Sequence, residues 1–151
     1  MDNRETISKT PEQTFAFGEQ LAGSLKAGDV VLLYGGLGAG KTLLTKGILN
    51  ALEFDIDEVT SPSFTLVNLY KTASFDVYHI DLWRLDAAEN TASAVGLEEI
   101  LENENAVTII EWADRLGKFS FPNRTISVKI DGDGDQQREI QLIVEPSKDL
   151  T

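Results

Sequence analysis

Eight consecutive residues, Gly35 to Thr42, have the composition of a phosphate-binding loop. They read Gly-Gly-Leu-Gly-Ala-Gly-Lys-Thr, which fits the pattern of Gly, any four residues, Gly, Lys and then Ser or Thr. Glycines let the backbone curve so that successive N–H groups point into one concavity that accepts anions. We expect Lys41 to reach the β- and γ-phosphates of a nucleotide, and the Thr42 hydroxyl to ligate Mg²⁺.

Two carboxylates that end apolar segments are candidates for the rest of the metal site. Glu111 follows Val-Thr-Ile-Ile, and Asp81 follows Val-Tyr-His-Ile. P-loop proteins gather such ligands at the carboxyl ends of neighbouring strands. Spacing alone does not rank the two residues, because either position suits a metal ligand or a group that orients the attacking water. A carboxylate that merely faces solvent is the alternative for each.

Three further features near these residues have both a functional and a structural interpretation. His79, the only histidine, shares a strand face with Asp81, so it is a candidate to contact phosphate, orient that carboxylate or transfer a proton; simple packing is the alternative. Trp112 would lie against the nucleotide or a partner, although core packing is the default for tryptophan. The hydroxyls around Pro62 suit a switch segment that meets the γ-phosphate, or an ordinary turn; they belong to Ser61, Ser63 and Thr65.

The phosphate-binding loop needs a strand before it and a helix after it. Residues 29–34 form a continuous apolar run, which predicts a strand buried on both faces. In residues 42–52 leucine and isoleucine recur every four positions, which predicts a helix whose N-terminus adds positive charge to the phosphate site. Thr10 is predicted to cap an earlier helix that runs to about Leu25, with Gly28 after its end, and is also a candidate binding residue.

The rest of the pattern predicts a mixed sheet. Two hairpins are expected, at residues 64–70 with 75–81 and at 124–130 with 138–144, together with a short helix at 96–102 and a buried strand at 107–110. The acidic turn at 131–135 resembles the start of a calcium loop, but Gln136 and Leu142 replace the required Gly and Glu, so it is a hairpin turn. We expect one α/β domain over residues 1–151, a three-layer P-loop NTPase whose mixed sheet contains added antiparallel hairpins.

Composition limits the partners. The chain has 151 residues, 25 acidic against 13 basic, and a formal charge of −12, which disfavours direct nucleic-acid binding; any nucleic acid would be held by another chain. The absence of cysteine excludes a disulfide framework and a thiol nucleophile. With no apolar run long enough for a membrane span and no signal peptide, we expect a cytoplasmic protein without a membrane partner.

The sequence leaves three kinds of nucleotide-binding protein to compare. The guanine-reading Asn-Lys-x-Asp signature of GTPases is absent, which favours ATP. A small-molecule kinase needs a lid of arginines, but the five arginines here are scattered; Arg84, three residues after Asp81, is the most relevant of them. Besides an ATPase, the alternatives are therefore such a kinase or a nucleotide sensor that does not hydrolyse.

The order of four motifs resembles the TsaE (YjeE) family, bacterial ATPases needed to make threonylcarbamoyladenosine in tRNA. These motifs are the loop itself, Thr-Ser-Pro-Ser-Phe-Thr at 60–65, His-Ile-Asp-Leu-Trp-Arg-Leu at 79–85 and Ile-Glu-Trp-Ala-Asp at 110–114. The resemblance implies Thr42 and Glu111 as the Mg²⁺ site, Asp81 as the catalytic or water-positioning carboxylate, and residues 61–65 as the switch. It also implies association with the proteins TsaD and TsaB, of which TsaD transfers threonylcarbamoyl to adenosine.

This sequence departs from the family pattern at three positions. The family usually has Asp at Gly36, Thr at Ser63 and Tyr at Trp83; the last two replacements keep a hydroxyl and an aromatic ring. Gly36 removes a carboxylate beside the phosphates. The expected mechanism is slow ATP hydrolysis that partners accelerate and that resets the complex. Lys41 and Asp81 would be catalytic, and ATP·Mg²⁺ would be bound by Leu37, Gly38, Ala39, Gly40, Lys41, Thr42 and Leu43.

Overall fold

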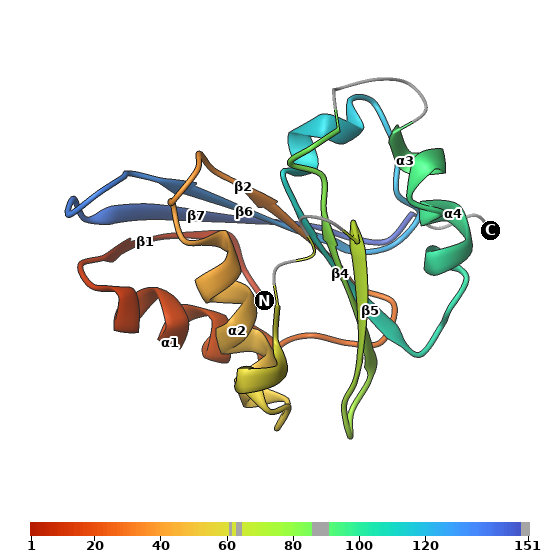
Figure 1. Cartoon of the computed structure of the whole chain (residues 1–151), viewed down its shortest axis with the longest axis horizontal. Coiled ribbons are helices and arrows are strands. Elements are labelled where there is room, and N and C mark those ends of the chain that lie inside the picture. The colour runs from red at the N-terminus through yellow and green to blue at the C-terminus, as the bar shows by residue number, and fades with distance from the viewer. Residues whose placement is uncertain (61, 63–64, 86–90, 149–151) are drawn as a thin grey trace.

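A seven-stranded sheet forms the middle layer of the computed structural model, which describes residues 1–60, 62, 65–85 and 91–148 (Figure 1). Its order is β1-β7-β6-β2-β5-β4-β3. The strands are β1 (Arg4–Ser8), β2 (Val30–Tyr34), β3 (Val67–Lys71), β4 (Asp76–Asp81), β5 (Ala106–Glu111), β6 (Thr125–Asp131) and β7 (Arg138–Glu145).

The centre of the sheet is parallel and its edges are antiparallel. β2 pairs in parallel with β5 and β6, and β4 pairs in parallel with β5, whereas β3, β7 and β1 join by antiparallel pairing. In this register Glu111 is the partner of Asp81 on one side and of Leu33 on the other. The two candidate carboxylates therefore end adjacent strands, next to the strand that leads into the phosphate-binding loop.

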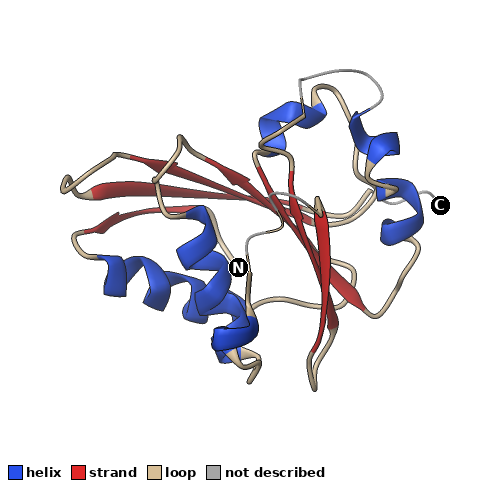
Figure 2. Ribbon diagram, in the orientation of Figure 1, coloured by secondary structure: helices blue, strands red, loops and turns tan. Residues whose placement is uncertain are grey.

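Helices cover the two faces of the sheet separately (Figure 2). On one side lie α1 (Pro11–Ala22) and α2 (Lys41–Ala51), followed by the 3-10 turn η1 (Ile56–Glu58). On the other lie α3 (Thr91–Ala94), α4 (Leu97–Leu101) and the 3-10 turn η2 (Ala113–Leu116). The alternation along β2 serves both layers, because Val31 and Leu33 pack toward α1 and α2 while Val30 and Leu32 pack toward the other core.

Two glycines let α1 and α2 approach closely. A Cβ on Gly18 of α1 would lie 2.2 Å from the carbonyl oxygen of Leu44, and a Cβ on Gly47 of α2 would lie 2.1 Å from that of Phe15. Neither position accepts a side chain without a shift of one helix against the other. Since α2 begins at Lys41, this contact helps to fix where the phosphate-binding loop ends.

The structure confirms the expected three-layer α/β architecture and both hairpins, and it corrects some boundaries. α1 ends at Ala22 with Gly23 as its cap, whereas Gly28, at φ +95°, turns the chain into β2. β3 begins later than predicted, because Leu66 has φ +67° and its N–H donates to the Pro62 carbonyl in a turn. The sequence did not predict α3, η1 or η2. None of the helices found in the described ranges is long and apolar enough to cross a membrane.

Candidate functional site

The predicted phosphate-binding loop joins β2 to α2 in a conformation that depends on its glycines. Gly38 has φ +78° and Gly40 has φ +119°, a left-handed region that costs other residues free energy. A Cβ on Gly35 would lie 2.8 Å from the Ile130 carbonyl oxygen of β6, so a side chain there would clash with the sheet. A Cβ on Gly36 would meet no atom within 4 Å, so this residue is not held to glycine by packing.

Lys41, the first residue of α2, is folded back over its own loop. Its Nζ donates to the carbonyl oxygens of Gly35 at 2.7 Å and Gly36 at 2.8 Å, and lies 4.2 Å from the centre of the Trp112 ring. Burial lowers the pKa of this ammonium, while the charges of Glu111 and nearby aspartates oppose that effect. The Lys41 ammonium thus lies against the carbonyl oxygens of its own loop and in the electric field of nearby carboxylates.

Thr42, Glu111 and His79 form a hydrogen-bonded chain beneath the loop. The Thr42 hydroxyl donates to Glu111 Oε1 at 3.0 Å, and His79 Nε2 lies 2.5 Å from Glu111 Oε2. His79 is fully buried and Glu111 is 2% exposed. The histidine therefore orients a carboxylate, which was one of its predicted roles, although the carboxylate at this contact is Glu111 and the prediction was Asp81. Sequence spacing does not reveal the pair, because 32 residues separate its members.

Asp81 and the two tryptophans lie beside this chain. Asp81 is buried, and its Oδ1 accepts a hydrogen bond from the backbone N–H of Trp83 at 2.9 Å. The rings of Trp83 and Trp112 are 4.7 Å apart at 44°, and Trp112 has φ +58°. The left-handed turn at Trp112 brings its ring over Lys41. Core packing was the default expectation for this residue, and its partly buried ring does pack against the core on this side of the sheet while it also borders the site.

These side chains surround one cavity of about 410 Å³. Its lining brings together residues that are distant in sequence: Leu37, Gly38, Gly40, Lys41, Thr42, Leu43, Asp81, Trp83, Glu111 and Trp112. One ammonium, one hydroxyl and two carboxylates thus converge on one space at the carboxyl ends of β2, β4 and β5, which is where open α/β sheets bind ligands.

A second cavity, of about 270 Å³, lies on the other side of the loop and shares Gly38, Gly40 and Leu43 with the first. Thr10, Thr14 and Arg138 line it. Thr10 also caps α1 as predicted, because its Oγ1 accepts a hydrogen bond from the Gln13 N–H at 3.2 Å. The candidate residue Thr10 is therefore adjacent to the loop, although on the side away from Asp81 and Glu111.

Arg138, at the start of β7, is a residue of this site that the sequence did not indicate. Its guanidinium donates to the loop carbonyls of Ala39 at 3.0 Å and Gly38 at 3.3 Å, and also to Gly134 at 3.1 Å in the hairpin turn. It thereby ties the phosphate-binding loop to the acidic turn. No motif marks it; only its place shortly after the turn that contains Gly132 and Gly134 distinguishes it from the other arginines.

The remaining predicted residues have different outcomes. Ser61 and Ser63 lie outside the described residues. Thr65 is exposed and donates to Asn68 Oδ1 at 3.0 Å within the turn before β3. Arg84 is exposed and is not among the described residues that line either cavity.

Comparison with known proteins shows the family of the chain. The family model described as "Threonylcarbamoyl adenosine biosynthesis protein TsaE" matches residues 8–140. Proteins called "tRNA threonylcarbamoyladenosine biosynthesis protein TsaE" are 37% identical in Rickettsia bellii, over 86% of this chain and 88% of that protein, and 33% identical in Treponema pallidum, over 90% and 97%. The crystal structure of Bacillus subtilis YdiB superposes with a TM-score of 0.74 at 31% identity, covering 95% of this chain and 87% of that one. The chain therefore belongs to the TsaE family of threonylcarbamoyladenosine biosynthesis proteins.

Proposed function

We propose that this protein binds ATP with Mg²⁺ and hydrolyses it to ADP and phosphate, in the service of threonylcarbamoyladenosine modification of tRNA. The observation that carries the proposal is the convergence of Lys41, Thr42, Asp81 and Glu111 on one cavity beside a glycine-rich loop. Each of these residue types has a distinct task in phosphoryl transfer to water, and the chain supplies all of them from two adjacent strands, β4 and β5, and the helix α2.

The loop and the N-terminus of α2 would hold the phosphates. Backbone N–H groups from Leu37 to Leu43 and the partial charge of the helix favour an anion there. Lys41, now hydrogen-bonded to the Gly35 and Gly36 carbonyls, has a flexible side chain whose ammonium would move a short way to meet the β- and γ-phosphates. The second cavity, lined by Thr10 and Arg138, adjoins the same loop and has room for the nucleoside.

The donor set near Thr42 suits Mg²⁺. The Thr42 hydroxyl and the Glu111 carboxylate are hard oxygen ligands 3.0 Å apart, and Mg²⁺ in nucleotide sites typically takes one or two such groups together with phosphate oxygens. The described residues contain no cluster of three or more His, Cys, Asp or Glu that would hold a metal without a substrate. When bound, the ion would neutralise charge that develops on the phosphates. His79 fixes the orientation of the Glu111 carboxylate through its contact with Oε2.

Asp81 would position the attacking water. It is buried at the end of β4, next to Glu111 in the sheet register, and it lines the cavity between Trp83 and the loop. Glu111 faces Thr42 and His79, whereas Asp81 lines the cavity from the end of the neighbouring strand, a position from which it could bear on a water beside the γ-phosphate. We propose in addition that the chain acts through TsaD and TsaB and meets tRNA only through them, because its charge of −12 opposes direct contact with a phosphate backbone.

The test is a pair of lysine variants on α2. Lys41→Ala removes the phosphate-binding ammonium, while Lys46→Ala removes a lysine of the same helix that does not line the cavity. We expect Lys41→Ala to lower ATP hydrolysis by at least about 100-fold and to abolish support of tRNA modification in a reconstituted mixture with TsaD and TsaB. Lys46→Ala should match the wild type in both assays.

Other outcomes would overturn parts of the proposal. Phosphorylated metabolite without free phosphate would identify a kinase. Tight ATP binding without phosphate release, with Asp81→Ala and Glu111→Ala fully functional in cells, would identify a sensor. If the isolated protein hydrolysed ATP at about ten or more per second, the common range for enzymes, and TsaD and TsaB changed nothing, the proposed coupling to those partners would fail.

A further inference from the structure

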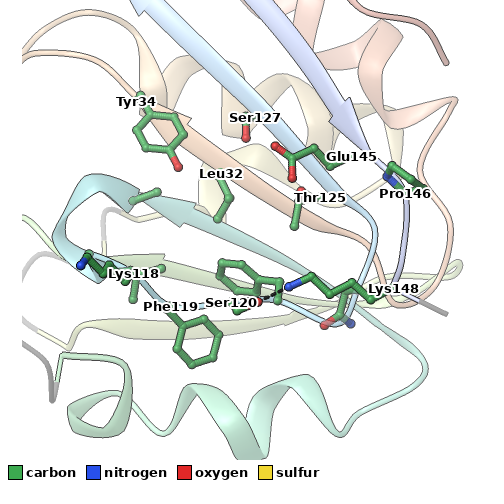
Figure 3. Close-up of a pocket in the computed structure, with 15 residues that line it drawn as sticks. Leu32, Tyr34, Lys118, Phe119, Ser120, Thr125, Ser127, Glu145, Pro146 and Lys148 are labelled. Carbon is green, nitrogen blue, oxygen red and sulfur yellow. Dashed lines mark hydrogen bonds between the residues drawn. The ribbon is translucent and has the colours of Figure 1, made fainter. Parts of the chain in front are cut away.

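A separate cavity of about 350 Å³ lies on the sheet face opposite α1 and α2 (Figure 3). One wall is the sheet, with Leu32 and Tyr34 of β2, Thr125 and Ser127 of β6, and Glu145 of β7. The opposite wall is the segment that follows η2 and carries Phe119 and Phe121, whose rings are 4.8 Å apart. None of the residues proposed to bind ATP lines this space.

The sheet wall is rich in hydrogen-bonding groups. Tyr34, Ser127, Thr125 and Glu145 lie side by side across three strands in Figure 3, as the sheet register requires. Burial, and then the charge of a nearby aspartate, raise the pKa of the Tyr34 phenol, so it stays a neutral donor and acceptor near neutral pH. Such a wall orients a polar ligand, and the aromatic wall opposite gives it apolar contact.

One polar atom of the lining lacks a protein partner although it is buried. Nδ2 of Asn123 donates to the Gly28 carbonyl at 2.8 Å, which fixes the amide, but among the described residues Oδ1 has no donor within reach. An unsatisfied buried acceptor costs about 1–3 kcal/mol, so its retention calls for a partner. Because Oδ1 is closed off from solvent, a ligand N–H in the cavity would reach it only if the neighbouring side chains shifted.

The charges at the rim are of both signs. In the part of the chain that the structure describes, Glu145, Lys118 and Lys148 form no ion pair. Lys148 reaches across the opening and donates to the Ser120 hydroxyl, as the dashed line in Figure 3 marks. A carboxylate on the sheet side and two ammonium groups on the other side complement a ligand that carries both charges.

We propose that this cavity binds a small zwitterion of the amino-acid class. Its ammonium would lie against Glu145, its carboxylate would meet Lys148 or Lys118, and its side chain would pack on the two phenylalanine rings. The size of the cavity suits a ligand of this class, since pockets for larger, drug-sized molecules extend to about 1,000 Å³.

The place of the cavity in the fold connects it to the ATP site. Tyr34 directly precedes Gly35 of the phosphate-binding loop, and η2 begins two residues after Glu111. A ligand in this cavity would therefore contact two segments, β2 and η2, that continue directly into the lining of the proposed ATP site. The binding proposal itself does not depend on ATP hydrolysis, and it is tested without nucleotide.

The experiment uses the intact chain labelled with ¹⁵N and the protein L-amino acids, added singly up to about 10 mM, a range that detects weak binding. We expect at least one of them to give saturable shifts at the amides of Tyr34, Ser127 and Phe119. Glu145→Gln should weaken that binding about tenfold, the effect of losing one charge-assisted hydrogen bond. The matched control is Glu139→Gln, an exposed carboxylate on the same strand and the same sheet face but outside the cavity; it should leave the affinity unchanged.

Lys148→Met tests in the same way the proposed contact with the carboxylate of the ligand, and Lys129→Met on β6 is its control. The proposal is overturned if no amino acid gives saturable shifts at these amides. It is equally overturned if Glu145→Gln and Lys148→Met bind as well as the wild type, or if the two control variants weaken binding as much as the cavity variants do.

Discussion

The buried contact between His79 and Glu111 supports a quantitative prediction about both stability and metal binding. His79 Nε2 lies 2.5 Å from Glu111 Oε2, and both side chains are almost entirely shielded from water. His79→Phe keeps an aromatic ring of similar shape but removes the nitrogen. Glu111 then loses one of its two partners and keeps only the Thr42 hydroxyl.

The magnitude follows from burial. A buried hydrogen bond to a charged group contributes about 1.5–3 kcal/mol, and a partner left without it bears its own desolvation cost. We therefore expect His79→Phe to lower the free energy of unfolding by about 2–3 kcal/mol. Glu111→Met removes the other partner, and the double variant should lose about 2 kcal/mol less than the sum of the two single losses.

Urea unfolding of the four proteins measures this coupling, and a Mg²⁺ titration of nucleotide affinity gives an independent result. If Glu111 ligates Mg²⁺ as proposed, loss of the histidine that orients it should weaken the Mg²⁺ dependence about 10–100-fold. Single effects on stability that add to within about 0.5 kcal/mol would refute the structural argument. Coupling in stability without any change in Mg²⁺ dependence would instead refute the assignment of Glu111 as the ligand.

Three further predictions concern other parts of the fold. Gly18→Ala places a Cβ 2.2 Å from the Leu44 carbonyl oxygen and should cost about 1–3 kcal/mol in urea unfolding, whereas Gly23→Ala, whose nearest contact is 3.5 Å, should be neutral or stabilising by up to about 1 kcal/mol; equal effects would contradict the close helix contact. Gly36→Asp restores the carboxylate usual in the family at an open position, so the unfolding free energy should change by less than about 0.5 kcal/mol; a larger loss would show a packing role. Tyr34, whose pKa is raised above 10.0 mainly by burial, contributes stability that is fully present below the unfolded pKa and lost as pH rises through the folded pKa; a titration of ¹³C-labelled tyrosine with a midpoint at or below 10.0 would disprove this.

Residues that line the candidate cavity could be named from the sequence because strand ends are local features. Glu111 and Asp81 each follow an apolar run, and parallel pairing brings the carboxyl ends of such strands to one edge. The loop from Gly35 to Thr42 can also be predicted without knowledge of tertiary contacts, because its glycines permit the backbone conformation that such a loop requires. What periodicity cannot supply is the strand order. That order makes Glu111 a neighbour of Leu33 and brings it within reach of Thr42 on α2.

The missed features all depend on contacts between distant segments. His79 was recognised as a candidate, but its contact with Glu111 follows from the register of β4 on β5. The sequence does not show that Gly18 and Gly47 are required to be glycine, because that requirement follows only from the packing of α1 against α2. The short helix α3 contains only four residues, too few for a hydrophobic period to show.

Arg138 illustrates why a residue without a motif can still matter to the site. Its guanidinium joins carbonyl oxygens of Gly38 and Ala39 to that of Gly134, so one side chain links the phosphate-binding loop to a hairpin turn about 100 residues away. The loop N–H groups can face phosphate only while the loop carbonyls face elsewhere, and Arg138 satisfies two of those carbonyls. The acidic turn, which has no metal-binding pattern of its own, therefore has a role as the second anchor of that arginine. Its geometry sets where the guanidinium lies, and the guanidinium in turn holds the backbone of the predicted phosphate-binding loop.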